Sequence, residues 1–175
     1  MNHTIEHDEL LDLVNDQDEV IGVIGRKQAY AEDKLASLRA IWFFIKNEDG
    51  LFWIPRRHDQ KKQSPNALDG STVGHVSAGE SYEQAMIREV AEELNFDVAG
   101  LPYRKVGKLT PATGSISFIE IFELQVHNNI LINYNKDDFS GYYWLSAQEI
   151  VAKFHQGHPM RKTLYMIMKK IYGAE

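Results

Sequence analysis

Residues 74–96 read GHVSAGESYEQAMIREVAEELNF, and this stretch says most about how the chain folds. Ser81 followed three residues later by Gln84 is typical of a helix start, because each side chain can bond a free backbone N–H at the other position. Apolar side chains then recur at the spacing of one helix face: Met86, Val90 and Leu94. The stretch therefore predicts a loop followed by a helix with one buried stripe.

Three glutamates of this helix lie on one narrow arc beside the apolar stripe. At about 100° per residue, with Glu89 at 0°, Glu92 lies at about 300° and Glu93 at about 40°. A solvated acidic face is the ordinary explanation for such an arc. Clustered carboxylates repel one another, however, and a divalent cation such as Mg²⁺ removes that repulsion. The geometry suggests metal-assisted attack of water on a phosphate ester or anhydride.

The spacing of these residues resembles the signature of the Nudix hydrolases. The matching positions, in register, are Gly74, Glu80, Arg88, Glu89, Val90, Glu92, Glu93 and Phe96. Asn95 stands where the family has glycine, and asparagine tolerates the left-handed conformation better than most residues with a Cβ. We therefore interpret residues 74–96 as a Nudix box.

Residues around the box resemble one branch of this family, which is related to isopentenyl-diphosphate isomerase. They are Arg57, Lys61, Pro65, Asp69, Gly74, His75, Val76, Gly79, Glu80 and Ser81. The isomerase itself moves a proton with a cysteine, whereas this chain has no cysteine and carries Val73 at that position. Leu38 stands about where a metal-binding histidine would be expected. Both differences count against isomerisation.

The resemblance implies a role for each charged residue of the box. Glu89 and Glu93 would be the principal metal ligands, and Glu92 would complete the cluster and take part in catalysis with Glu93. Arg88 would orient these carboxylates, and Glu80 would support the start of the helix. The implied cofactor is Mg²⁺ or Mn²⁺.

The general base of such enzymes often lies outside the box. The resemblance makes four carboxylates candidates, of which we select the first: Glu120, Glu123, Asp137 and Asp138. For each, a surface carboxylate is the alternative interpretation.

The loop over residues 58–73 is polar, and a loop of that length is uncommon in a compact domain unless it is functional. Arg56, Arg57 and Lys61 lie at its start and can clamp substrate phosphates. A solvated basic loop is the alternative. His75, next to the box glycine, could contact a phosphate or metal or be structural.

Strands and helices are mixed without strict alternation, which predicts an α/β (α+β) fold with a mixed sheet between helices. Residues 10–15 and 20–24 predict an N-terminal β-hairpin after a polar tail over residues 1–8. A C-terminal helix is expected over residues 158–173, packed on its own core or on the partner of a homodimer. The length fits a single domain over residues 1–175.

Composition narrows the possible partners. Nineteen Lys+Arg against 25 Asp+Glu give a net charge of −6, which disfavours a nucleic-acid polymer. The lack of cysteine excludes a disulfide framework and a thiolate metal site. No apolar run approaches the ~20 residues that cross a bilayer, and the first residues do not form a secretory signal. We expect a cytoplasmic protein with a small-molecule diphosphate substrate.

The sequence therefore predicts a metal-dependent pyrophosphohydrolase that cleaves a nucleoside diphosphate-linked or related metabolite. A hydrolase of a non-nucleotide diphosphate such as thiamin diphosphate is an alternative, because residues 53–57 (WIPRR) with Asp69 resemble such proteins. The isomerase remains a second alternative. The third is a catalytically silent binding module, against which the intact acidic cluster argues.

Overall fold

The computed structural model describes residues 8–175, so the expected polar tail lies outside the described residues except for Asp8. A six-stranded sheet has the order β6-β7-β3-β4-β8, and β5 also pairs with β3. Its strands are β3 (Arg39–Asn47), β4 (Phe52–Arg57), β5 (Thr72–His75), β6 (Arg104–Leu109), β7 (Phe118–Val126) and β8 (Phe139–Leu145). β3 and β7 are parallel while β3 and β5 are antiparallel, which confirms the predicted mixed sheet.

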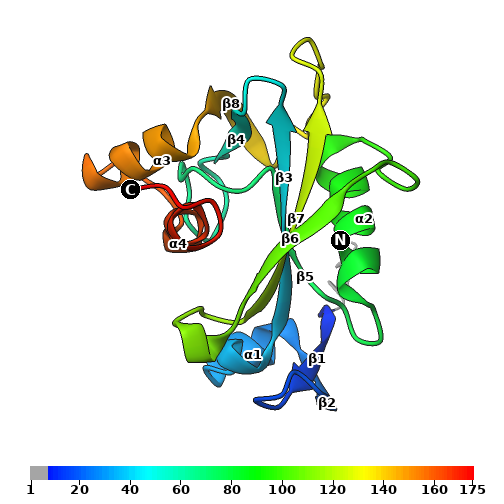
Figure 1. Ribbon diagram of the computed structural model, residues 1–175. Helices are drawn as coiled ribbons and strands as arrows, with labels where there is room; N and C mark the ends of the chain where they lie inside the picture. Colours follow the sequence, from blue (N-terminus) through cyan, green and yellow to red (C-terminus); the bar gives the residue numbers. More distant parts are fainter. Residues whose placement is uncertain (1–7) are drawn as a thin grey trace, which may run out of the picture.

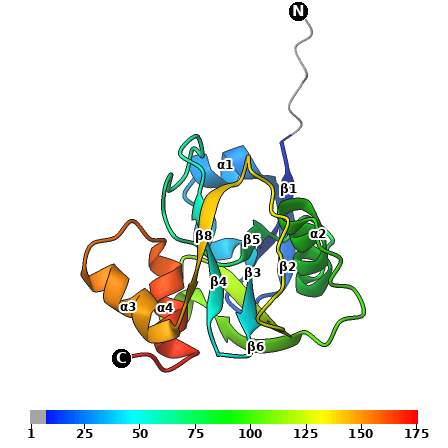
Figure 2. The same cartoon turned by 90° about the horizontal axis from the view of Figure 1, so that it is seen from above.

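Helices cover both faces of this sheet (Figure 1). α2 (Tyr82–Leu94) lies on one face, and α3 (Ala147–His155) with α4 (Lys162–Lys170) lies on the other. The view from above in Figure 2 shows the same separation. The short elements are α1 (Arg26–Ala31), η1 (Leu35–Ser37) and η2 (Pro111–Thr113). The expected sheet between helices is therefore confirmed.

β3 runs through the centre of the hydrophobic core. Trp42 and Phe44 belong to the cluster on the α4 side, whereas Ile41, Phe43 and Ile45 belong to the cluster on the α2 side. A strand buried on both faces reads as a continuous apolar run, because neither face needs polar residues. This explains the uninterrupted run at the centre of β3.

The predicted N-terminal hairpin is present as β1 (Leu10–Val14) and β2 (Val20–Gly25), paired antiparallel. Asp18 in its turn accepts hydrogen bonds from Arg39 Nε at 2.6 Å and from the Tyr82 hydroxyl at 2.9 Å. Asp12 accepts from the Gly79 N–H at 3.1 Å. These contacts hold the hairpin against β3 and against the start of α2.

The C-terminal helix is shorter than the predicted range of 158–173. Residues 159–161 instead run beside Leu68, whose N–H donates to Pro159 O at 2.9 Å and whose carbonyl accepts from Arg161 N–H at 3.0 Å. That pairing requires extended backbone at Arg161 (φ −66°, ψ 127°), so the helix begins only at Lys162. Its apolar face packs on the sheet of its own chain. Within residues 8–175, no helix has the length and apolarity to span a membrane.

Candidate active site

α2 begins and ends as its sequence predicts. Ser81 Oγ accepts from the Gln84 N–H at 3.2 Å, and Gln84 Oε1 accepts from the Ser81 N–H at 2.8 Å. Asn95 ends the helix in the left-handed region, at φ 48° and ψ 39°. Because both ends are fixed locally, the helix presents Glu89 and Glu93 at a defined register.

Glu89 and Glu93 line a pocket of about 830 Å³. The third glutamate of the arc, Glu92, does not line this pocket, and its side chain is 60% exposed against 13% for Glu89. Of the three predicted glutamates, Glu89 and Glu93 therefore line the pocket and form an inward pair, whereas Glu92 lies outside it. Among residues 8–175, no group of three or more acidic, histidine or cysteine side chains stands ready to hold a metal ion.

Burial makes the inward pair costly to ionise. It raises the pKa of Glu93 to about 8, and the neighbouring Glu89, Asp138 and Asp69 carboxylates add to this rise. Burial raises the pKa of Glu89 to about 7, although its hydrogen bond with Arg88 opposes the change. Glu93 Oε2 is buried without a hydrogen-bond partner in the described chain. These two carboxylates fit a divalent cation, which would supply the missing positive charge.

Gly74, the first residue of the box, makes room for Glu89. A Cβ added to Gly74 would lie 2.0 Å from the Glu89 Cδ atom, far inside van der Waals contact. β5 holds Gly74 there because it pairs with β3, with Gly74 opposite Ile41. The glycine is therefore required by packing against a carboxylate rather than by a turn.

Arg88, to which the resemblance gives an orienting role, contacts Glu89. Its Nη1 donates to Glu89 Oε1 at 2.7 Å, and its Nε and Nη2 each donate to Glu80 at 2.9 Å. Arg88 also lies 3.5 Å from Glu92. Glu80 is outside the pocket lining and acts on it through Arg88. The expected support of the helix start by Glu80 takes the form of this ion pair and of a hydrogen bond from the Ser77 N–H at 3.0 Å.

His75 lines the pocket as a neutral ring. Burial, aided by the nearby charge of Arg26, lowers the pKa of His75 to about 4. Its Nε2 lies 3.0 Å from the hydroxyl of Tyr30 on α1, and its Nδ1 has no hydrogen-bond partner within residues 8–175. The site therefore holds a polar but uncharged group beside Glu89.

Of the three predicted phosphate-binding cations, the structure brings two to the pocket. Arg57 and Lys61 line it, and Lys61 is paired with Asp138. Arg56 does not line it and instead donates to Ser140 Oγ at 3.1 Å. The register of β4 against β8 shifts between Arg56 and Arg57, and only Arg57 lines the pocket.

The structure also places Glu120 away from the inward pair. Its carboxylate pairs with Lys105 at 3.1 Å and with Lys108 at 3.7 Å, and it does not line the pocket. In β7 Glu120 stands level with Ile41, whose side chain packs on the α2 side of the sheet. The alternation of the strands therefore turns Glu120 away from the face on which Trp42 lines the pocket.

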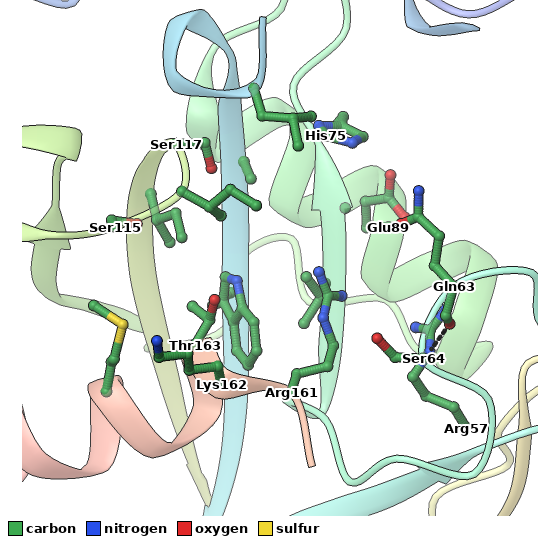
Figure 3. Close-up of a pocket in the computed structure, with 18 of the residues that line it drawn as sticks. Arg57, Gln63, Ser64, His75, Glu89, Ser115, Ser117, Arg161, Lys162 and Thr163 are labelled. Atoms are coloured by element: carbon green, nitrogen blue, oxygen red, sulfur yellow. Dashed lines mark hydrogen bonds between the residues drawn. The ribbon is translucent and has the colours of Figure 1, made fainter. Parts of the chain in front are cut away.

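Some lining residues were missed by sequence reasoning. Arg161 lines the pocket and extends into it from the start of α4, as Figure 3 shows. Ser115 and Ser117 face the pocket from the segment before β7. No motif connects these positions with the box, because they reach it only through the fold. Trp42 is both buried and part of the lining.

The geometry agrees with comparisons to known proteins. A family model described as NUDIX domain matches residues 36–166. A Nudix hydrolase of Deinococcus radiodurans is 36% identical over 169 residues, which cover 96% of this chain and 96% of that protein. An uncharacterised Nudix hydrolase of Nostoc sp. is 36% identical over 166 residues, with 94% of this chain and 96% of the relative covered.

Solved structures share the arrangement. A crystal structure of a Deinococcus radiodurans protein matches with a TM-score of 0.86 at 36% identity, over 94% of this chain and 99% of that one. The Escherichia coli dihydroneopterin triphosphate pyrophosphohydrolase matches with a TM-score of 0.56 at 19% identity, over 78% of this chain and 96% of that one. The second likeness concerns the fold alone.

Proposed function

This chain belongs to the Nudix family and is a hydrolase of phosphoanhydride bonds, and from that premise we propose that it cleaves the diphosphate bond of a small phosphorylated metabolite with Mg²⁺ or Mn²⁺. The observation that carries the proposal is the buried pair of Glu89 and Glu93, one of whose oxygens has no partner in the described chain. A bound divalent cation would neutralise this pair, polarise a phosphoryl group and acidify a coordinated water.

Each residue of the box has a task in this proposal. Glu89 and Glu93 hold the cation, and Arg88 keeps Glu89 in place through a hydrogen bond of 2.7 Å. Glu80 and Glu92 hold Arg88 from two other sides, so we assign Glu92 a supporting role at the rim rather than an inner ligand position. Gly74 leaves the space that Glu89 occupies.

The rest of the pocket fits the substrate that we propose, a nucleoside diphosphate-linked metabolite. Arg57 and Lys61 supply positive charge for phosphates, and the neutral His75 offers a hydrogen bond without adding charge. Trp42 and Ile119 give the same pocket an apolar wall. A volume of about 830 Å³ lies within the range of sites for ligands much larger than inorganic pyrophosphate.

A phosphate-release screen tests the proposal. Candidate substrates are nucleoside di- and triphosphates, nucleotide sugars, dinucleotides and thiamin diphosphate, each with and without Mg²⁺ or Mn²⁺. We expect release only where protein and metal are both present, and a loss of release in Glu93→Gln. Glu83→Gln is the matched control, because it removes one charge from the same helix outside the pocket.

Three results of the screen would contradict the proposal. Binding of a diphosphate without any turnover would favour a binding module. Conversion of isopentenyl diphosphate to its allylic isomer would favour the isomerase. Equal release with and without metal would mean that the two glutamates do not hold a catalytic cation.

A further inference from the structure

Three segments that are distant in the sequence run side by side at the wall of the pocket. They are, in chain order, residues 55–57, residues 67–69 and residues 159–161. Between the first two, Arg57 N–H donates to Ala67 O at 3.0 Å and Asp69 N–H donates to Pro55 O at 3.1 Å. Between the second and third, Leu68 bonds residues 159 and 161 through its N–H and its carbonyl. The backbone therefore places Arg57, Asp69 and Arg161 next to one another.

The charges of these three side chains do not cancel. Asp69 is buried, at 1% exposure, and its Oδ2 accepts from Arg57 Nη1 at 2.9 Å and from Arg161 Nη1 at 3.3 Å. Its Oδ1 accepts from the Gly70 N–H at 2.9 Å. One carboxylate thus serves two guanidinium groups, which leaves one positive charge in excess. The Arg161 side chain keeps 29% of its surface exposed, so its charge remains open to an anion that enters the pocket.

Arg161 directs its remaining donors to the pocket. Its guanidinium lies over the Trp42 ring at 5.4 Å, and Figure 3 shows it projecting from the start of α4 toward Glu89. Nη1 bonds Asp69, and the other N–H groups of the guanidinium have no acceptor among residues 8–175. Asp69 raises the pKa of Arg161, and the charge of Glu93 contributes to this rise.

The two lining cations that the sequence singled out, Arg57 and Lys61, are more fully engaged. Arg57 donates hydrogen bonds from Nη1 to Asp69 and from Nε to the Gln63 carbonyl, the second at 3.1 Å. Lys61 is paired with Asp138. Arg161 therefore offers more uncommitted donors than either of the cations that the sequence singled out, in the planar geometry that matches phosphate oxygens.

We propose that Arg161 binds a phosphoryl group of the substrate across the pocket from Glu89 and Glu93, and that Asp69 is the positioning residue that aims it. The inference rests on the proposed function, since it needs a diphosphate in this pocket. It makes the start of α4 part of the substrate site. The Asp69 carboxylate restrains Arg161 before the substrate arrives, which lowers the entropy lost on binding.

The test measures binding and turnover separately. Methylenediphosphonate is a diphosphate analogue that resists hydrolysis because a carbon atom replaces the bridging oxygen. It is titrated with Mg²⁺ into the full-length protein by calorimetry. We expect Arg161→Gln to weaken its binding at least tenfold and to raise KM for the best substrate by a similar factor, with kcat changed less than about threefold. Lys169→Gln is the matched control, because it removes one charge from an exposed position of the same helix.

A second pair of variants separates contact from folding. Arg161→Lys keeps the charge but not the planar fork, so we expect it to recover only part of the lost affinity. Asp69→Asn should raise KM as Arg161→Gln does, and the double variant should be no worse than the poorer single variant. Calorimetric binding of Mn²⁺ alone should persist in each, which a general collapse of the site would not allow.

The outcomes distinguish this inference from the proposed function. Unchanged binding and KM in Arg161→Gln, with turnover intact, overturns the role of Arg161 alone. Lost binding in that variant together with no turnover of any diphosphate by the native protein supports Arg161 and overturns the hydrolase proposal. Failure of the native protein to bind the diphosphonate overturns the role of Arg161, and the phosphate-release screen decides the hydrolase proposal separately.

Discussion

Glu93 is the residue whose chemistry depends most on a cation, because its buried Oε2 has no partner in the described chain. Glu93→Gln removes the charge and keeps the shape. We expect kcat to fall at least 100-fold, which corresponds to about 2.7 kcal/mol of barrier. Without metal, the variant should be at least as stable as the native protein, since an unpaired buried charge is costly.

Steady-state kinetics and thermal unfolding in EDTA measure these two effects, with Glu83→Gln as the control. Turnover that persists within about tenfold of native would show that Glu93 is not a principal ligand. A large loss of stability in the metal-free variant would show that the carboxylate is held by the protein itself.

A substitution at Gly74 tests how closely Glu89 packs against β5. Because a Cβ at this position would meet the Glu89 side chain, Gly74→Ala must displace that carboxylate. We expect affinity for Mn²⁺ to fall at least tenfold and kcat/KM to fall with it. Gly141→Ala is the matched control, since nothing lies within 4 Å of a Cβ added there. Native metal affinity in Gly74→Ala would mean that the backbone moves away and that Glu89 stays.

At the scale of the element, the residue that ends α2 can be tested for its tolerance of the left-handed conformation. Asn95 has φ 48° and donates from Nδ2 to Asn133 O at 2.8 Å. Asn95→Ala loses that bond and strains the left-handed backbone, so we expect a loss of about 1–2 kcal/mol in the free energy of unfolding. Asn95→Gly relieves the strain and should change it by less than about 1 kcal/mol. Urea unfolding measures both, and equal losses would contradict the role of the turn.

The predictability of each element follows from how local its determinants are. The start and end of α2 depend on Ser81, Gln84 and Asn95, which lie within the element, and all three behave as predicted. The start of α4 depends instead on pairing with Leu68, which is distant in the sequence, and the predicted boundary was wrong by several residues.

The same rule explains the residues of the candidate site. Helical periodicity places Glu89, Glu92 and Glu93 on one arc, but it could not predict that Glu92 points away from the pocket. Arg56 and Glu120 could not be assigned in this way, because the side on which a strand residue lies depends on which face carries the pocket. Arg161 could not be found at all, since its partner Asp69 is brought to it only by the fold.

For the molecule as a whole, the distribution of charge matters more than its sum. The chain carries a net charge of −6, yet Arg26, Arg57, Lys61 and Arg161 all line one pocket. A concave positive region in an acidic protein attracts anions to one place and repels them elsewhere. The two inward glutamates oppose that attraction until a cation joins them, which couples metal binding to substrate binding.

That coupling predicts how pH and metal act on the stability of the whole protein. The pKa is raised from an ordinary 4.5 to about 7 for Glu89 and about 8 for Glu93. Between the ordinary and the raised pKa, the folded state binds more protons than the unfolded state, so stability falls as pH rises. The contribution of this pair is complete below about pH 4.5 and is lost as pH rises through about 8.

A bound cation favours the ionised carboxylates, so stabilisation by Mg²⁺ must grow over the same range of pH. We expect the shift of the melting temperature on adding Mg²⁺ to be several degrees larger at pH 8.5 than at pH 5.5, by differential scanning fluorimetry against EDTA; about 1 kcal/mol would produce such a change. In Glu93→Gln the dependence on pH should be weaker, because only Glu89 of the two groups that titrate over this range remains. A shift that is equal at both pH values in the native protein would mean that the cation binds elsewhere, and the assignment of Glu89 and Glu93 would fail.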